Sequence, residues 1–172
     1  KPDTSRANAL IDLLSTAYFQ KQRTELFTYW EEAYHLCTKL QYRKGLSFCY
    51  FWKANYSRGS NDLPGFHLYT DSSILYSENA DPAQWAKVHR LKGLQYQQEE
   101  NYYAALKHYF KALEYYETVK SENTLHLYQN ISSAYLNLST PDKAEKYAKE
   151  GVALAEESWV PVNIKLQAFS SL

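Results

Sequence analysis

The chain contains no methionine, and only two cysteines, five glycines and five prolines among its 172 residues. Glycine is too scarce for the loops that hold phosphate groups, and no Gly/Ser-rich or Pro-rich tract marks a linker. No run of apolar residues approaches the ~20 that a membrane-spanning helix needs. The chain starts at Lys1 and ends at Leu172 within a helical pattern, so we expect it to be a segment of a longer protein.

An excess of charge of either sign is also missing, because 19 Lys and Arg residues balance 19 Asp and Glu residues. Nucleic-acid-binding proteins usually carry a basic surplus, so we expect no direct nucleic-acid contact from this segment. We expect Cys37 and Cys49 on the apolar faces of consecutive helices, as free buried thiols. A disulfide between them would require their Cα atoms to lie within about 7 Å.

Recognisable catalytic and metal-binding sets are absent from the sequence as well. The histidines do not follow a spacing such as His-Glu-x-x-His, and the adjacent glutamate pairs would diverge on a helix. Both cysteines lie on predicted core faces, where the thiolate form is disfavoured. We therefore expect no catalytic residue, no metal ligand and no cofactor, and we predict that the chain is not an enzyme.

Tyrosine is abundant, with 17 residues in a sequence that is 45% apolar. Small and aromatic residues recur at steps of three and four, which is the period of a helix with one apolar stripe. The stretch 85–117 shows this pattern best, with Ala105, Tyr109 and Tyr116 in its second half. The link 98–101 between its two halves is entirely polar, and it predicts a turn between two antiparallel helices.

This stretch resembles the tetratricopeptide repeat, a pair of antiparallel helices that stacks on further copies of itself. The matching positions hold a small residue before an aromatic one in the first helix, and two small residues around an aromatic one in the second. They are Gly93, Tyr96, Ala105, Tyr109 and Ala112. His89 and Lys92 depart from the family pattern, which has a large residue and a leucine there. The marker aromatics Tyr18, Tyr56, Tyr96 and Tyr135 lie 38, 40 and 39 residues apart, against about 34 in the family.

The resemblance implies an all-α fold, a right-handed superhelical solenoid of antiparallel helix pairs in a single domain over residues 1–172. We expect repeats over roughly 5–41, 43–79, 81–120 and 122–158, and the start of a fifth over 161–172.

Local signals predict several helix boundaries. Gly59 is expected to stop a helix, and Ser60 or Asn61 to start the next one. Asp81 followed by Pro82 predicts another start, with a cap and then a proline at the first helical position. Gly65 stands where the family has alanine, at a cost of ~1 kcal/mol in helix stability. We therefore expect a close contact that requires glycine there.

Members of the family bind partners on the concave face, which the first helix of each pair lines. The residues that map to this groove are Tyr50, Phe51, Lys87, Arg90, Gln97, His126, Gln129, Asn130 and Asn137. Amides and long polar side chains that converge on a groove can hold a peptide main chain or a carboxylate. The same residues are also consistent with an ordinary solvated face. The full set of residues with which some members clamp a terminal carboxylate is not present.

We expect the chain to be a non-catalytic scaffold that binds a protein or a peptide. The opening segment 2–14 resembles the start of repeat-bearing sensor regions of bacterial two-component histidine kinases and transcriptional regulators. That resemblance implies the extracytoplasmic, periplasmic sensing part of a larger membrane-bound signalling protein, and it is compatible with a homodimer. The alternatives are a cytoplasmic peptide-sensing transcriptional regulator and an assembly or co-chaperone adaptor.

Overall fold

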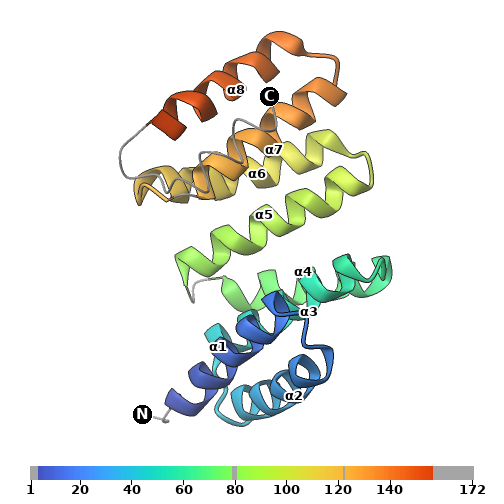
Figure 1. Cartoon of the computed structure of the whole chain (residues 1–172), viewed down its shortest axis with the longest axis vertical. Helices are drawn as coiled ribbons and strands as arrows, with labels where there is room; N and C mark the ends of the chain where they lie inside the picture. The colour runs from blue at the N-terminus through green and yellow to red at the C-terminus, as the bar shows by residue number, and fades with distance from the viewer. Residues whose placement is uncertain (1–3, 79–80, 122, 157–172) are drawn as a thin grey trace. The chain divides into compact units, whose positions relative to one another are not determined.

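The computed structural model describes residues 4–78, 81–121 and 123–156, and the regular secondary structure in them is entirely helical. Eight α-helices lie within these residues, and Figure 1 shows them in chain order from blue to red. They are α1 (Ser5–Phe19), α2 (Arg23–Lys39), α3 (Arg43–Gly59), α4 (Leu63–Ser77), α5 (Pro82–Gln98), α6 (Tyr102–Thr118), α7 (Asn123–Asn137) and α8 (Pro141–Glu156). The predicted all-α class is confirmed.

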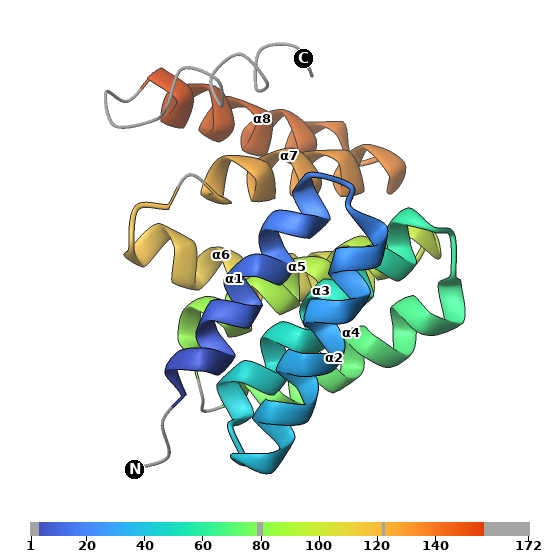
Figure 2. The ribbon, with the colours of Figure 1, turned by 60° about the horizontal axis from the view of Figure 1, so that its bottom comes forward.

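Consecutive helices pack as antiparallel pairs. The pairs are α1 with α2, α3 with α4, α5 with α6, and α7 with α8. Figure 2 shows the α7–α8 pair side by side, joined by a short turn. This arrangement is consistent with a helical repeat and confirms the predicted helix pairs. The expected fifth repeat over 161–172 lies outside the described residues.

The chain divides into two compact units, Lys1–Val88 and His89–Leu172, here called unit 1 and unit 2. In unit 1, α3 packs against both α1 and α2 as well as its own partner α4. In unit 2, α7 packs against α6 as well as α8. In unit 1, the helix that follows the first pair therefore packs on both members of that pair.

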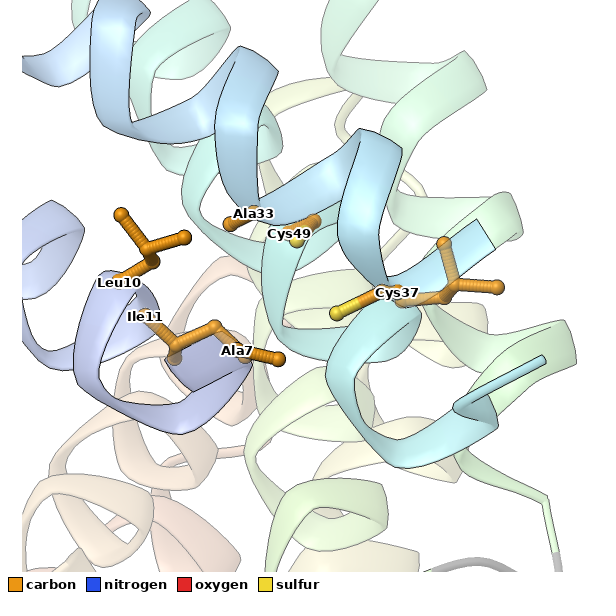
Figure 3. Packing of buried hydrophobic residues seen from close by; sticks show 7 residues of the cluster. Ala7, Leu10, Ile11, Ala33, Cys37 and Cys49 are labelled. Atoms are coloured by element: carbon orange, nitrogen blue, oxygen red, sulfur yellow. The ribbon is translucent and has the colours of Figure 1, made fainter. Parts of the chain in front are cut away.

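The core of unit 1 is built from small and apolar side chains of α1, α2 and α3. Figure 3 shows Ala7 on α1, Ala33 and Cys37 on α2, and Cys49 on α3 within this core. Both cysteines are free and fully buried, as predicted. A hydrogen bond from the Cys49 thiol lowers the pKa of Cys37, and the same bond together with burial raises the pKa of Cys49.

Three glycines, Gly45, Gly65 and Gly93, lie where a larger side chain would not fit. A Cβ atom on Gly93 would collide with the ring of Tyr109, which α6 presses against α5. A Cβ atom on Gly65 would collide with the carboxylate of Asp62 and lie 2.7 Å from the hydroxyl oxygen of Ser57. The close contact expected at Gly65 is therefore confirmed, and its partner is the residue that caps the same helix.

Six turns between helices share one backbone geometry. In each turn one residue other than glycine adopts the left-handed conformation, with φ between 48° and 59°. These residues are Lys21, Gln41, Asn61, Glu100, Lys120 and Ser139. The next residue's N–H then bonds to a carbonyl five residues earlier, as Tyr42 bonds to Cys37 with an N–O distance of 2.8 Å. This is the Schellman motif, which satisfies carbonyl groups left unpaired at a helix end.

The predicted start of α4 at Ser60 or Asn61 is wrong. The helix begins at Leu63, and Asp62 caps it by accepting a hydrogen bond from the Gly65 N–H at 3.0 Å. Ser60 and Asn61 are used instead to end α3, with Asn61 in the left-handed conformation. The predictions that Gly59 ends α3 and that Pro82 begins α5 are confirmed.

Candidate partner-binding site

In unit 2, three of the predicted groove residues line one hollow of about 430 Å³. Gln97 comes from α5, while Gln129 and Asn130 come from α7. The other lining residues are Leu125, Ser132, Ser133 and Leu136 of α7 and Tyr147, Ala148, Gly151 and Val152 of α8. The hollow therefore combines amide and hydroxyl groups with an apolar wall, and we call it the amide hollow.

The amides of this hollow differ in how far the fold already uses them. Gln97 accepts a hydrogen bond from the Tyr109 hydroxyl at 2.7 Å and donates one to the Ser133 hydroxyl at 3.4 Å. It therefore ties α5 to α6 and α7. The half-buried side chain of Asn130, in contrast, makes no hydrogen bond with any part of the chain that the structure describes. The described part of the chain therefore uses neither the donor nor the acceptor of the Asn130 side chain.

The other predicted residues of unit 2 lie outside the lining of this hollow. Asn137 is exposed at the end of α7, and its amide donates to the Ser133 carbonyl of the same helix at 2.8 Å. His126 is half-buried one turn before Asn130. Arg90, on α5, lies close enough to Tyr116 for its charge to counteract burial, which raises the pKa of that tyrosine to about 12.

The remaining predicted residues belong to unit 1. Tyr50 is packed between rings of neighbouring helices, and its hydroxyl donates to the Tyr34 hydroxyl at 3.2 Å. Burial and this bond raise the pKa of Tyr50. Phe51 packs against Trp52 at a ring distance of 5.2 Å. Lys87 is exposed on α5, with its ammonium 5.8 Å from the ring centre of Phe48.

A histidine pair in unit 2 is missing from the sequence-based prediction. The Nδ1 atoms of His89 on α5 and His108 on α6 lie 2.8 Å apart and share a hydrogen bond. Burial lowers the pKa of His89 to about 3, and the positive charges of His108 and Lys111 contribute to that shift. The two histidines are far apart in the sequence, so a search for local metal-binding spacings does not find the pair.

An aromatic cluster in unit 1 was also missed. Tyr18 and Phe19 at the end of α1 pack against Trp52 of α3, with ring distances of 5.1 and 5.5 Å. Tyr18 is one of the marker aromatics of the repeat pattern, and its neighbour on the helix points about 100° away from it. That reasoning alone places Phe19 in solvent, where most of it lies, but it does not predict the contact of the ring with Trp52.

A lysine of unit 1 lies among aromatic rings. The Lys53 ammonium is 3.6 Å from the ring centre of Trp30, a cation–π contact between α3 and α2. Burial against these rings lowers the pKa of Lys53.

A metal site and a membrane-spanning helix are two further features that this part of the chain could have carried. Within 4–78, 81–121 and 123–156, no three His, Cys, Asp or Glu side chains gather as a metal site would require. No helix in this part of the chain combines the length and the apolar character that crossing a bilayer demands. No protein-family model matches the chain, and no curated protein matches it.

Proposed function

We propose that the chain is a non-catalytic scaffold of the tetratricopeptide-repeat type that binds a protein or a peptide. The helix pairs and the close approach of Gly93 to Tyr109 support the resemblance on which this proposal rests. The observation that carries the binding function is the amide hollow, in which Asn130 holds an amide without a hydrogen-bond partner among the described residues.

The chemistry of the amide hollow suits an extended peptide. An asparagine side chain can donate to a carbonyl and accept from an N–H, which are the two groups that every residue of a peptide presents. The apolar wall formed by Leu136 and Val152 offers a surface for a side chain of the same peptide. Most ligand sites combine such an apolar lining with a few convergent polar groups.

The test of this function is the variant Asn130→Ala, measured on an array of random immobilised peptides. We expect peptides that bind the natural chain to bind the variant about tenfold more weakly, because hydrogen bonds to the main chain are lost. Asn137→Ala is the matched control, since it changes the same residue type on the same helix outside the hollow. The proposal fails if no peptide binds, or if both variants bind as the natural chain does.

We further propose that the chain is part of a larger signalling protein. The resemblance of segment 2–14 to bacterial sensor regions supports a sensing part of a larger two-component or transcriptional regulatory protein. Sequencing the complete gene tests this extension. A signal peptide before the segment with a membrane helix and a kinase after it would support the extension, and a gene without an output domain would contradict it.

A further inference from the structure

Aromatic rings gather at the end of α1 and on the adjoining face of α3. The residues Tyr18, Phe19, Phe51 and Trp52 form this group, which we call the aromatic patch. Phe19 is 72% exposed, although a fully buried phenylalanine would be more stable by about 1.5–3 kcal/mol. Trp52 meets Phe19 edge-to-face, with an interplanar angle of 81°. The exposed ring is therefore held in place by its neighbours rather than hanging loosely in solvent.

A hollow of about 470 Å³ adjoins the aromatic patch, and its charge has one sign. Its lining residues are Ala17, Tyr18, Phe19, Lys21, Gln22, Arg23, Leu26, Asn55, Tyr56, Gly59 and Ser60. Two of them are cations, Lys21 and Arg23, and none is a carboxylate. We call this space the cationic hollow.

The cations of this hollow are available for a ligand. Arg23 lies over the ring of Tyr56 at 5.7 Å, a contact that leaves the edge of the guanidinium free to donate hydrogen bonds. Neither Arg23 nor Lys21 forms an ion pair within the residues that the structure describes. Glu25 lies in the same first turn of α2 as Arg23 but does not line the hollow.

We propose that the aromatic patch and the cationic hollow together bind an extended segment of another protein in which an aromatic or large aliphatic residue stands beside Asp or Glu. The apolar side chain would cover Phe19 and Trp52, and the carboxylate would pair with Arg23 and Lys21. Arginine pairs with carboxylates through two parallel hydrogen bonds, which fixes the direction of the bound segment. This surface lies in unit 1 and extends the proposed function by a second site that does not involve the amide hollow.

The test is selection of displayed random peptides on the natural chain, with the double variant Phe19→Ser/Arg23→Ala used to remove peptides that bind elsewhere. The peptides that remain should carry Asp or Glu next to Trp, Phe or Leu. In fluorescence anisotropy with one such peptide, Phe19→Ser should weaken binding about tenfold, because the buried apolar area is lost. Arg23→Ala should weaken it about threefold to tenfold, and this difference should shrink as salt is added.

Matched controls separate this site from the rest of the chain. Tyr103→Ser removes an aromatic side chain that is 76% exposed on α6, and it should leave the affinity unchanged. Asn130→Ala should also have no effect, so failure of this site and failure of the amide hollow give different results. A set of selected peptides without acidic residues, or no peptide that distinguishes the natural chain from the double variant, would overturn the proposal. Self-association of the natural chain that Phe19→Ser abolishes would overturn it as well, because the surface would then bind a second copy.

Discussion

At the scale of single residues, the stability of this fold depends on places where a small residue packs against a large side chain. Gly93 of α5 lies against the ring of Tyr109, which is fully buried. The Tyr109 hydroxyl donates to Gln97 on the same helix as the glycine, so the ring is fixed at both its face and its tip. A methyl group at position 93 would have to displace this ring.

Gly93→Ala should therefore lower the free energy of unfolding even though alanine favours helices. The gain in helix propensity is about 1 kcal/mol, and overpacking a buried ring costs about 1–3 kcal/mol. We expect a net loss of up to about 2 kcal/mol in urea unfolding followed by circular dichroism.

Gly151→Ala is the matched control for this substitution. A Cβ atom there would lie 3.5 Å from Leu125 and Tyr128, which is an ordinary contact, so this variant should gain up to about 1 kcal/mol. Stabilisation by both substitutions would show that the Tyr109 ring moves aside without cost.

The histidine pair makes stability depend on pH. His89 has a folded-state pKa of about 3, against an ordinary value of 6.5. Below pH 6.5 the unfolded chain takes up a proton at this residue and the folded chain does not. The stability that the neutral His89 contributes is therefore complete above pH 6.5 and is lost progressively as the pH falls toward 3.

Between pH 6.5 and 4 this loss should amount to about 3 kcal/mol at most. Urea unfolding midpoints measured across this range should fall less steeply for His89→Gln than for the natural chain. His35→Gln, at an exposed position of α2, is the control and should follow the natural chain. Equal slopes for all three proteins would contradict the assignment to His89.

The sequence predicts contacts between neighbours in the repeat pattern better than contacts between polar side chains. The pattern of small and aromatic residues is enough to predict that Gly93 and Tyr109 approach each other. It does not predict the bond from Tyr109 to Gln97 or the pairing of His89 with His108. Those contacts depend on the distance and rotation between two helices, which the spacing along either helix does not specify.

At the scale of helices and turns, the recurring feature is a left-handed residue that is never glycine. Such a backbone conformation costs residues with a Cβ atom roughly 1 kcal/mol, and asparagine tolerates it better than most. Glu100, between α5 and α6, adopts it with φ at 59°, and Asn61 adopts it between α3 and α4. The hydrogen bonds of the turn compensate for this cost in each case.

Glu100→Gly should raise the free energy of unfolding by about 0.5–1 kcal/mol, because glycine adopts this conformation without strain. Asn61→Gly should raise the free energy of unfolding by less, because asparagine already tolerates the left-handed conformation better than glutamate does. Lys107→Gly, at an exposed position within α6, should instead lose about 1 kcal/mol. Thermal unfolding of the three variants measures these changes, and a loss of stability in Glu100→Gly would contradict the explanation.

Helix ends are harder to predict in this chain than helix interiors, and the turns explain why. Glycine is the usual signal for the end of a helix, and the left-handed positions here hold Lys, Gln, Asn, Glu and Ser instead. The start of α4 was misplaced for this reason, since Ser60 and Asn61 have the composition of a cap. Proline is a more dependable signal, and Pro82 and Pro141 both begin helices.

For the molecule as a whole, helical periodicity along the chain is sufficient to predict the helix class and the pairing. The amide hollow was predicted in part, because Gln97, Gln129 and Asn130 were mapped to the concave positions of the family that the chain resembles. The sequence did not predict that α8 lines one wall of the hollow, because that surface forms only when α7 and α8 pack together. The aromatic patch was missed because it combines the end of one helix with the middle of another.

The scarcity and burial of sulfur in this chain affect how it responds to oxidants. Cys37 and Cys49 are shut away from solvent, and there is no methionine thioether for a peroxide to attack. Methionine sulfoxide therefore cannot form on this chain, and cysteine sulfenic acid should form slowly on the folded protein. In an oxidising medium the sulfur atoms of the folded chain should therefore change slowly, and unfolding should speed their oxidation.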